Sequence, residues 1–214
     1  MPASSPLPRA VAWALRPAGA ARVRICVSGI APGEAAALSG KVRRQGLHWT
    51  FVEPDARRAA ALRRALGGRT DVLVVEADAR RLLSAAAGTH AFPADAPLPS
   101  EQLPAHREAF DLVVLGGGLL EGLESEALAW LGLASRAARV AWVMHAAAAA
   151  APPRGGLARM RAWFGKGESE NTGRTSGEWR DLLRQSGARV LRIRDGGDGF
   201  LLAVGRGQAP PAKE

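Results

Sequence analysis

One strand–turn–helix–strand pattern restricts the possible folds of this chain more than any other feature. Residues 22–34 (RVRICVSGIAPGE) form an apolar run followed by a glycine-containing turn, and Pro32 suits the first turn of a helix. One helix length later, residues 48–55 (HWTFVEPD) form a second apolar run that ends in acids. A βαβ unit of this kind presents backbone N–H groups and a carboxylate to a nucleotide-like ligand.

Strand and helix patterns alternate along most of the chain. This alternation predicts an α/β fold, a Rossmann-like three-layer sandwich with a seven-stranded, mostly parallel sheet. The turn GGDG between the last two apolar runs predicts a C-terminal hairpin, so that the final strand is antiparallel. The expected strands lie near 23–28, 48–53, 71–76, 110–115, 139–145, 189–194 and 199–204, and the expected helices near 33–44, 55–67, 124–137 and 176–186.

The length favours a single domain over residues 22–206. Residues 1–21 would form an N-terminal extension with a short helix over 10–16, and residues 207–214 a flexible tail. Two stretches interrupt the alternation, 88–109 and 146–174, and their length is typical of functional loops or lids.

Cysteine and histidine usage exclude several classes of site. Cys26 is the single cysteine of 214 residues, so neither a disulfide framework nor a thiolate metal cluster can form. The four histidines lack ligand spacing, and we expect no metal. No apolar run approaches the roughly 20 residues of a membrane helix, and no export signal is visible. We therefore expect a cytoplasmic protein without a membrane contact.

The formal net charge of +9 raises the alternative of a nucleic-acid-binding protein. Of the 29 basic residues, 3 are lysines and 26 are arginines. These arginines are scattered among alanines over the expected helices, a pattern typical of solvated faces. Nucleic acid is therefore an alternative partner that the sequence does not favour.

From about residue 22 to 206 the chain resembles the class I S-adenosylmethionine-dependent methyltransferases, and in particular the small-molecule O-methyltransferases. The resemblance depends on the glycine turn, on Glu53 at the end of the second strand, on VVEADARRL after the third and on FDLVVLGGGLLEGL around the fourth. It implies S-adenosylmethionine as cofactor. In the family the glycine turn surrounds the methionine part, which here corresponds to Gly29, Ile30, Ala31, Pro32 and Gly33.

The resemblance also implies roles for residues at the next strand ends. Glu53 would accept hydrogen bonds from the ribose hydroxyls, since a carboxylate can hold both hydroxyls of a diol. Asp78 would accept from the adenine amine, with Ala79 beside the ring. Gly116, in the loop after the fourth strand, would border the transferred methyl group.

Two positions depart from the family. An acid usually precedes the first glycine by two residues and holds the methionine amino group, but that position is Val27, and Ala31 replaces the middle glycine. Loss of one charge-assisted hydrogen bond costs on the order of 1.5 to 3 kcal/mol unless another group substitutes. Glu34 is one candidate substitute. The departures keep open a catalytically degenerate, partner-binding protein.

The sequence argues against two kinds of methyl acceptor, which narrows the class of substrate. The segment LGGGLL lacks the Asn/Asp-Pro-Pro-aromatic loop of amine-methylating DNA enzymes in this family, and Cys26 lies within a strand, unsuited to nucleophilic attack. We therefore expect methyl transfer to a small organic acceptor, at a hydroxyl oxygen, with a general base. An RNA-modifying methyltransferase is the alternative with the same cofactor, and a homodimer is left open.

His145 is the best candidate for the base, because it follows the fifth strand at the carboxyl edge where ligands of open α/β sheets bind. Trp163, Phe164 and Arg174 would line the acceptor pocket. His106 is a weaker second candidate. His48 begins the second strand and so lies at the opposite edge of the sheet, and His90 has no supporting context.

Structural explanations also exist for several of these residues. Asp55 and Asp78 suit helix caps, Asp111 and Trp179 suit packing roles, and the glycines suit tight turns.

Overall fold

The computed structural model describes residues 6–18, 22–42, 44–88, 110–120, 122–147, 174–196 and 200–208. The helices of this part are α1 (Leu7–Ala14), α2 (Pro32–Lys41), α3 (Ala56–Leu66), α4 (Ala79–Ala86), the 3-10 turn η2 (Gly117–Leu119), α5 (Glu124–Ala137) and α7 (Ser176–Gln185). The strands are β1 (Val23–Ser28), β2 (Leu47–Val52), β3 (Val72–Val75), β4 (Phe110–Gly116), β5 (Ala138–Ala147), β6 (Val190–Gly196) and β7 (Phe200–Arg206).

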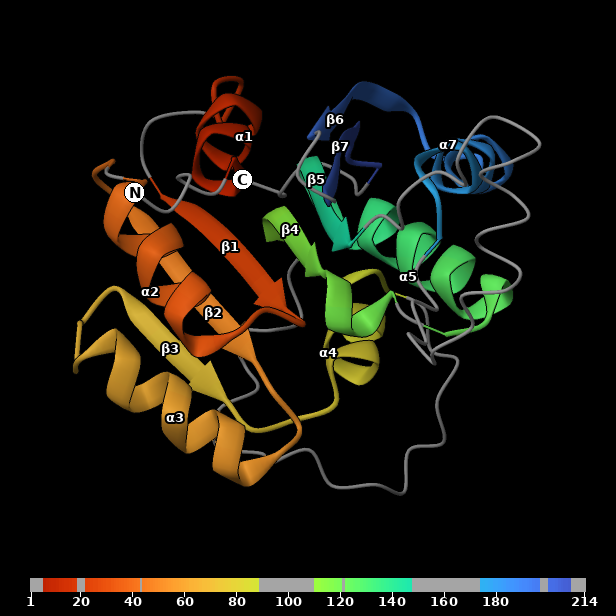
Figure 1. Ribbon diagram of the computed structural model, residues 1–214. Helices are drawn as coiled ribbons and strands as arrows, with labels where there is room; N and C mark the ends of the chain where they lie inside the picture. Colours follow the sequence, from red (N-terminus) through yellow and green to blue (C-terminus); the bar gives the residue numbers. More distant parts are fainter. Residues whose placement is uncertain are drawn as a thin grey trace.

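The seven strands form one sheet in the order β3-β2-β1-β4-β5-β7-β6 (Figure 1). β1 to β5 pair in parallel, and β7 runs antiparallel to both β5 and β6. The predicted seven-stranded sheet with a reversed C-terminal hairpin is therefore confirmed. The strand order changes direction at β1 and β4, and ligands of open α/β sheets bind beyond the carboxyl ends of strands at such a point.

Helices cover both faces of the sheet (Figure 1). The side chains of α1, α2 and α3 share one core cluster with alternate residues of β1, such as Ile25 and Val27. The side chains of α4, α5 and α7 form the other cluster, which takes Cys26 from the same strand. Because successive strand residues point to opposite faces, an unbroken apolar strand fills both cores at once.

Local signals explain most element boundaries. The Asp55 carboxylate caps α3, as the sequence suggested, by accepting from the Arg58 N–H at 2.8 Å, and Gly67 ends this helix at φ 65°. α2 stops at Lys41, three residues before the expected end, because Val42 has an extended backbone.

Two helices differ from the expected set. The N-terminal helix begins at Leu7 rather than near residue 10, since Pro8 fits its first turn. It packs against the sheet through Leu7, Val11 and Ala14. For α4 the sequence indicates only a start near Arg80 after the Asp78 cap; its extent is not predicted, because 8 residues are too few for a clear periodic pattern. Within the described part of the chain, no helix is long and apolar enough to cross a membrane.

Candidate active site

The carboxyl ends of the parallel strands bring several predicted site residues to one edge of the sheet. Ser28 pairs with Val52 and with Leu115 on its two sides, and Gly116 pairs with His145. The next residues along these strands, Gly29 and Glu53, therefore stand level with Gly116 and His145. The structure thus brings together residues whose elements are widely separated in sequence.

The glycine turn after β1 lies directly against the end of β4. Gly29 has φ 75°, a conformation that favours glycine. A Cβ on Gly116 would lie 2.1 Å from the Gly29 carbonyl oxygen, and a Cβ on Gly29 would lie 2.6 Å from Cγ of Leu119. Gly116 therefore permits a close approach of two backbones, a role that the sequence left open between turn and substrate contact.

The turn leads into the N-terminus of α2. Ile30 is buried, whereas Ala31 and Gly33 are exposed. Ala31 is the N-cap residue and contributes no side-chain hydrogen bond, in contrast to the carboxylates that cap α3 and α4. A helix N-terminus with open N–H groups favours a negatively charged group. Val27, at the family's acid position, is buried in the core on the α2 side.

Glu53 is 5% exposed and already has two partners. Its Oε1 accepts from the Asp55 N–H at 3.2 Å, and its Oε2 lies 3.2 Å from Nε of Arg58. The Arg58 side chain is 55% exposed, so this ion pair can exchange with a ligand at modest cost. The sequence did not identify Arg58 as a partner of Glu53. Its helix carries several arginines, and nothing in the sequence distinguishes Arg58 from the others.

Asp78 and Ala79 begin α4 beyond the end of β3. The Asp78 carboxylate accepts from the Arg80 N–H at 2.8 Å, so its predicted capping role is confirmed. Asp78 is exposed and Ala79 is buried. Contact of this pair with an adenine ring stays a prediction.

His145 is 7% exposed and is joined to Glu34 across the end of β4. Its Nδ1 lies 2.9 Å from Oε1 of Glu34, which extends from the first turn of α2. A carboxylate at Nδ1 fixes the orientation of the imidazole and favours the tautomer with the proton on this nitrogen. No local sequence pattern predicts the contact between Glu34 and His145, because it depends on the strand order, which brings the start of α2 close to the end of β5.

Two polar residues have structural roles, as the sequence suggested. The Asp111 carboxylate accepts from the backbone N–H of Arg24 at 2.8 Å and from Nε of Arg139 at 3.1 Å. Cys26 is fully buried, and burial raises the pKa of its thiol to about 12. A thiol with this pKa stays protonated near neutral pH, which excludes it as a nucleophile.

Arg174, a predicted acceptor contact, joins the start of α7 to the loop after β4. Its guanidinium donates to the carbonyl oxygens of Leu120 at 2.7 Å and Gly122 at 2.5 Å, and it stacks on Trp179 with 4.9 Å to the ring centroid. Trp179 packs in the core, as the sequence suggested, and donates to the Ala147 carbonyl.

Four predicted residues lie outside the described residues: Trp163, Phe164, His90 and His106. Among the described residues, no group of three metal-ligating side chains comes together.

No protein-family model matches the sequence, and no curated protein matches it either. Solved structures match its fold. The magnesium protoporphyrin IX methyltransferase of Synechocystis PCC 6803 with bound SAH matches with a TM-score of 0.58 at 13% identity, over 94% of this chain and 82% of that one. Human N-acetylserotonin methyltransferase in complex with SAM matches with a TM-score of 0.55 at 16% identity, over 94% of this chain and 51% of that one. The mitomycin 7-O-methyltransferase MmcR matches with a TM-score of 0.55 at 17% identity, over 94% of this chain and 54% of that one.

These similarities extend over nearly all of this chain but only about half of two of the three proteins. At such low identity they establish the fold, and the strand order and reversed hairpin agree with it. The chain has the fold of the class I S-adenosylmethionine-dependent methyltransferases.

Proposed function

We propose that this chain is a methyltransferase that uses S-adenosylmethionine and methylates a hydroxyl oxygen of a small organic acceptor. The main support is one arrangement: the open N-terminus of α2, the buried Glu53 carboxylate and Asp78 lie beyond the carboxyl ends of β1, β2 and β3, in that order. Two of the matching structures contain SAM or SAH, and the third is an O-methyltransferase, which supports this cofactor and this reaction for the chain.

The side chains present at this edge fit the cofactor part by part. The N–H groups of Gly33 and Glu34 in the first turn of α2 suit the methionine carboxylate. Glu53 suits the ribose hydroxyls once Arg58 is displaced, and Asp78 with Ala79 suits the adenine. Val27 supplies no acid for the amino group; the half-buried Glu34 carboxylate is the nearest replacement in sequence.

The cofactor supplies an electrophilic methyl group on a sulfonium. Methyl transfer forms an acceptor O–CH₃ bond and breaks the S–CH₃ bond, and the hydroxyl proton must leave. His145 would take this proton at Nε2, because Glu34 holds the opposite nitrogen. Nε2 is buried in this structure, so the proposal requires that the acceptor displace the atoms that cover it. Glu34 would then stabilise the imidazolium as a positioning residue. Arg174, Trp163 and Phe164 would contribute to the acceptor pocket from the chain that precedes α7.

A catalytically degenerate binding protein is the second candidate. Val27 and the Glu53–Arg58 ion pair favour it, since both remove a carboxylate from the ligand side of the site.

Calorimetric titration with S-adenosylmethionine and S-adenosylhomocysteine separates the two candidates. We expect micromolar binding by the intact chain and a loss of at least about tenfold for Glu53→Ala, the value of one charge-assisted hydrogen bond. Asp181→Ala is the matched control, because this carboxylate is exposed on α7 and pairs with Arg184. Absence of binding by the intact chain would favour the degenerate protein and refute the enzyme proposal.

A further inference from the structure

A groove rich in arginine lies between α1 and the edge strand β6, on the sheet face that α1 covers. Arg192 and Arg194 project from β6 toward α1, and the guanidinium of Arg192 lies over the ring of Trp13, 5.8 Å from its centroid. Leu202 and Val204 of β7 form the apolar floor. We name this the α1–β6 groove; its polar and aromatic lining residues are Arg9, Trp13, Arg192 and Arg194.

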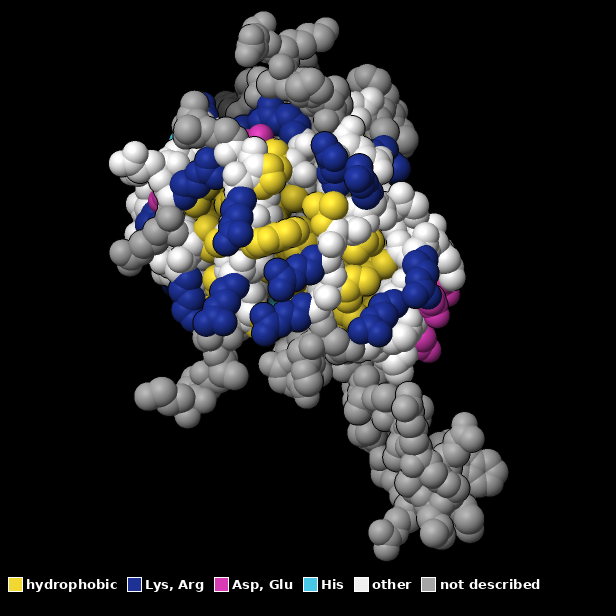
Figure 2. Space-filling model, turned by 90° about the horizontal axis from the view of Figure 1, so that it is seen from above, with side chains coloured by type: hydrophobic (Ala, Val, Ile, Leu, Met, Phe, Trp, Pro, Cys, Tyr) yellow, Lys and Arg dark blue, Asp and Glu magenta, His cyan; other side chains and the backbone are white. Residues whose placement is uncertain are grey.

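The charge of the groove has one sign. None of its lining residues is acidic, and the first 33 residues of the chain contain no Asp or Glu. Within the described part of the chain, no carboxylate forms an ion pair with Arg9, Arg192 or Arg194. Figure 2 shows this side of the molecule, where basic side chains surround a strip of apolar ones and few acidic side chains appear. Such a surface attracts an anionic ligand.

The shape of the groove favours a long ligand over a small one. Its enclosed part measures about 60 Å³, well below the roughly 300 Å³ at which small-molecule pockets begin. β6 is the last strand of the sheet, so the groove is open along the sheet edge. Arg192 and Arg194 are two residues apart on this strand, a separation of about 6.6 Å, which is comparable to that of successive phosphates in an extended single strand.

The combination of arginine with tryptophan indicates what kind of polymer fits. Arginine binds phosphate through two parallel N–H donors, and a half-buried indole offers a face on which an unpaired base can stack. Stacking of this kind requires a base that is free of a partner strand, so a duplex does not fit. An acidic peptide would use the arginines alone, whereas a base could in addition stack on the indole in place of the Arg192 guanidinium.

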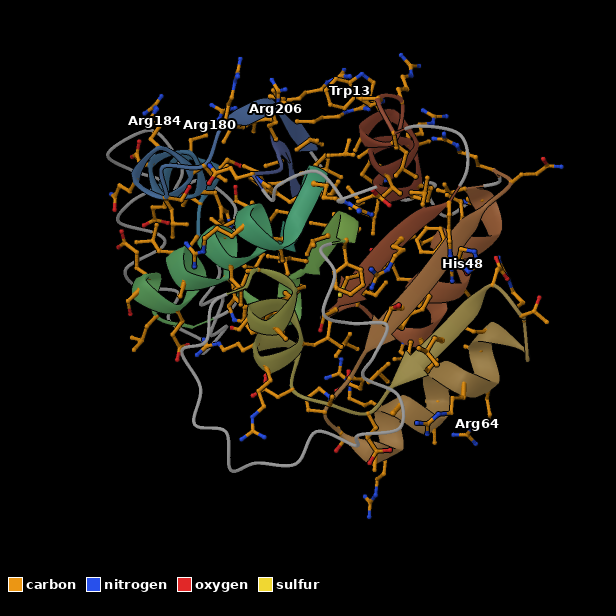
Figure 3. All side chains as sticks on the ribbon, turned by 180° about the vertical axis from the view of Figure 1, so that it is seen from behind. Trp13, His48, Arg64, Arg180, Arg184 and Arg206 are labelled. Atoms are coloured by element: carbon orange, nitrogen blue, oxygen red, sulfur yellow. The ribbon has the colours of Figure 1, made fainter. Side chains whose placement is uncertain are left out.

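We propose that the α1–β6 groove binds single-stranded nucleic acid, with phosphates on Arg9, Arg192 and Arg194 and a base on Trp13. The groove is a second site in addition to the proposed cofactor edge, and it does not depend on the methyltransferase proposal. Figure 3 shows Arg206, Arg180 and Arg184 on the same side of the molecule as Trp13, which extends the basic surface from α1 toward α7.

Fluorescence anisotropy with short labelled oligouridylate and oligothymidylate, on the full chain and at several salt concentrations, tests this. Three phosphate contacts predict a slope of log affinity against log salt of about −2, at about 0.7 for each contact. The variant Arg192→Ala/Arg194→Ala should bind at least about tenfold more weakly. Its salt dependence should be shallower, with a slope between about −1 and 0, because one phosphate contact remains. Trp13→Leu should lose about fivefold or more, and Trp13→Phe should retain most of the affinity.

The matched control is Arg57→Ala/Arg64→Ala on α3, which removes the same charge; in Figure 3 Arg64 lies at the lower right of the molecule, far from Trp13 at the top. Its affinity should stay within about twofold of the unmodified chain. The proposal is overturned by absence of binding, by equal losses in the two double variants, or by competition from polyglutamate as strong as that from unlabelled oligonucleotide. Circular dichroism and S-adenosylmethionine titration of each variant distinguish loss of the groove from loss of the fold or of the cofactor site.

Discussion

Replacing Gly116 by alanine tests the close approach of β1 and β4 at the candidate active site. The added Cβ would lie 2.1 Å from the Gly29 carbonyl oxygen and 2.5 Å from Cγ2 of Ile30. Carbon and carbonyl oxygen normally approach to about 3.3 Å, so the two backbones must separate by roughly 1 Å. Gly116 itself has φ −85°, which alanine adopts freely, so the cost is steric alone.

Because the Gly29 carbonyl and the buried Ile30 side chain lie in a turn that packs tightly against the end of β4, we expect the upper end of overpacking costs, about 3 kcal/mol of unfolding free energy. For a chain of this size that lowers Tm by roughly 6 to 12 °C. Gly118→Ala is the control: its Cβ would lie 3.5 Å from the same oxygen, an ordinary contact, and its unfolding free energy should change by less than about 0.5 kcal/mol. Thermal and urea unfolding measure both variants. Equal Tm values for the two would refute the steric argument.

Four further changes give separate tests. Gly33→Ala should leave the unfolding free energy equal or raise it by about 0.5 kcal/mol, since no atom lies within 4 Å of the new Cβ; a lower urea midpoint would contradict this. Asp111→Ala should cost about 2 to 3 kcal/mol in urea unfolding, because it leaves a backbone N–H and a half-buried arginine without their acceptor; a loss below about 0.5 kcal/mol would speak against the role. Arg174→Ala should cost about 1 to 2 kcal/mol in the same assay through its two carbonyl contacts, and an unchanged midpoint would show that they contribute nothing. Cys26, with its pKa raised by burial to about 12, should react with a thiol reagent at pH 8 only after unfolding, and fast reaction of the native protein would disprove its burial.

The central strands β1, β2, β4 and β5 could be predicted because each is buried on both faces and therefore reads as a mostly apolar run. The edge strands β3 and β6 are more exposed and were placed by their position between turns and helices. Most observed strand ends lie within two residues of the expected ones. The alignment of Gly29, Glu53 and Asp78 along one edge could also be predicted, since it follows from local patterns and from the rule that parallel strands end together. Whether these three residues hold a cofactor stays a prediction.

Contacts between distant elements could not be predicted. The approach of Gly29 to Gly116 depends on which strand pairs with β1 and in which register, and no short pattern states either. The same holds for the α1–β6 groove: along the sequence the arginines appear scattered, and the reversed hairpin brings Arg192 beside Trp13. A scattered distribution along the chain therefore does not exclude a concentrated charge on the surface.

The link between Glu34 and His145 connects the two halves of the proposed reaction. Glu34 belongs to the first turn of α2, where the methionine part would lie, and His145, which was expected just after the fifth strand, lies within β5 because that strand continues to Ala147. If cofactor binding moves the N-terminus of α2, it also changes the orientation of the imidazole, because one hydrogen bond joins them. A base held in this way would be aligned only when the methyl donor is present. This dependence would give Val27, at the position where the resemblance implies an acid, a physical consequence, since the Glu34 carboxylate at the turn would then serve both the cofactor and the base.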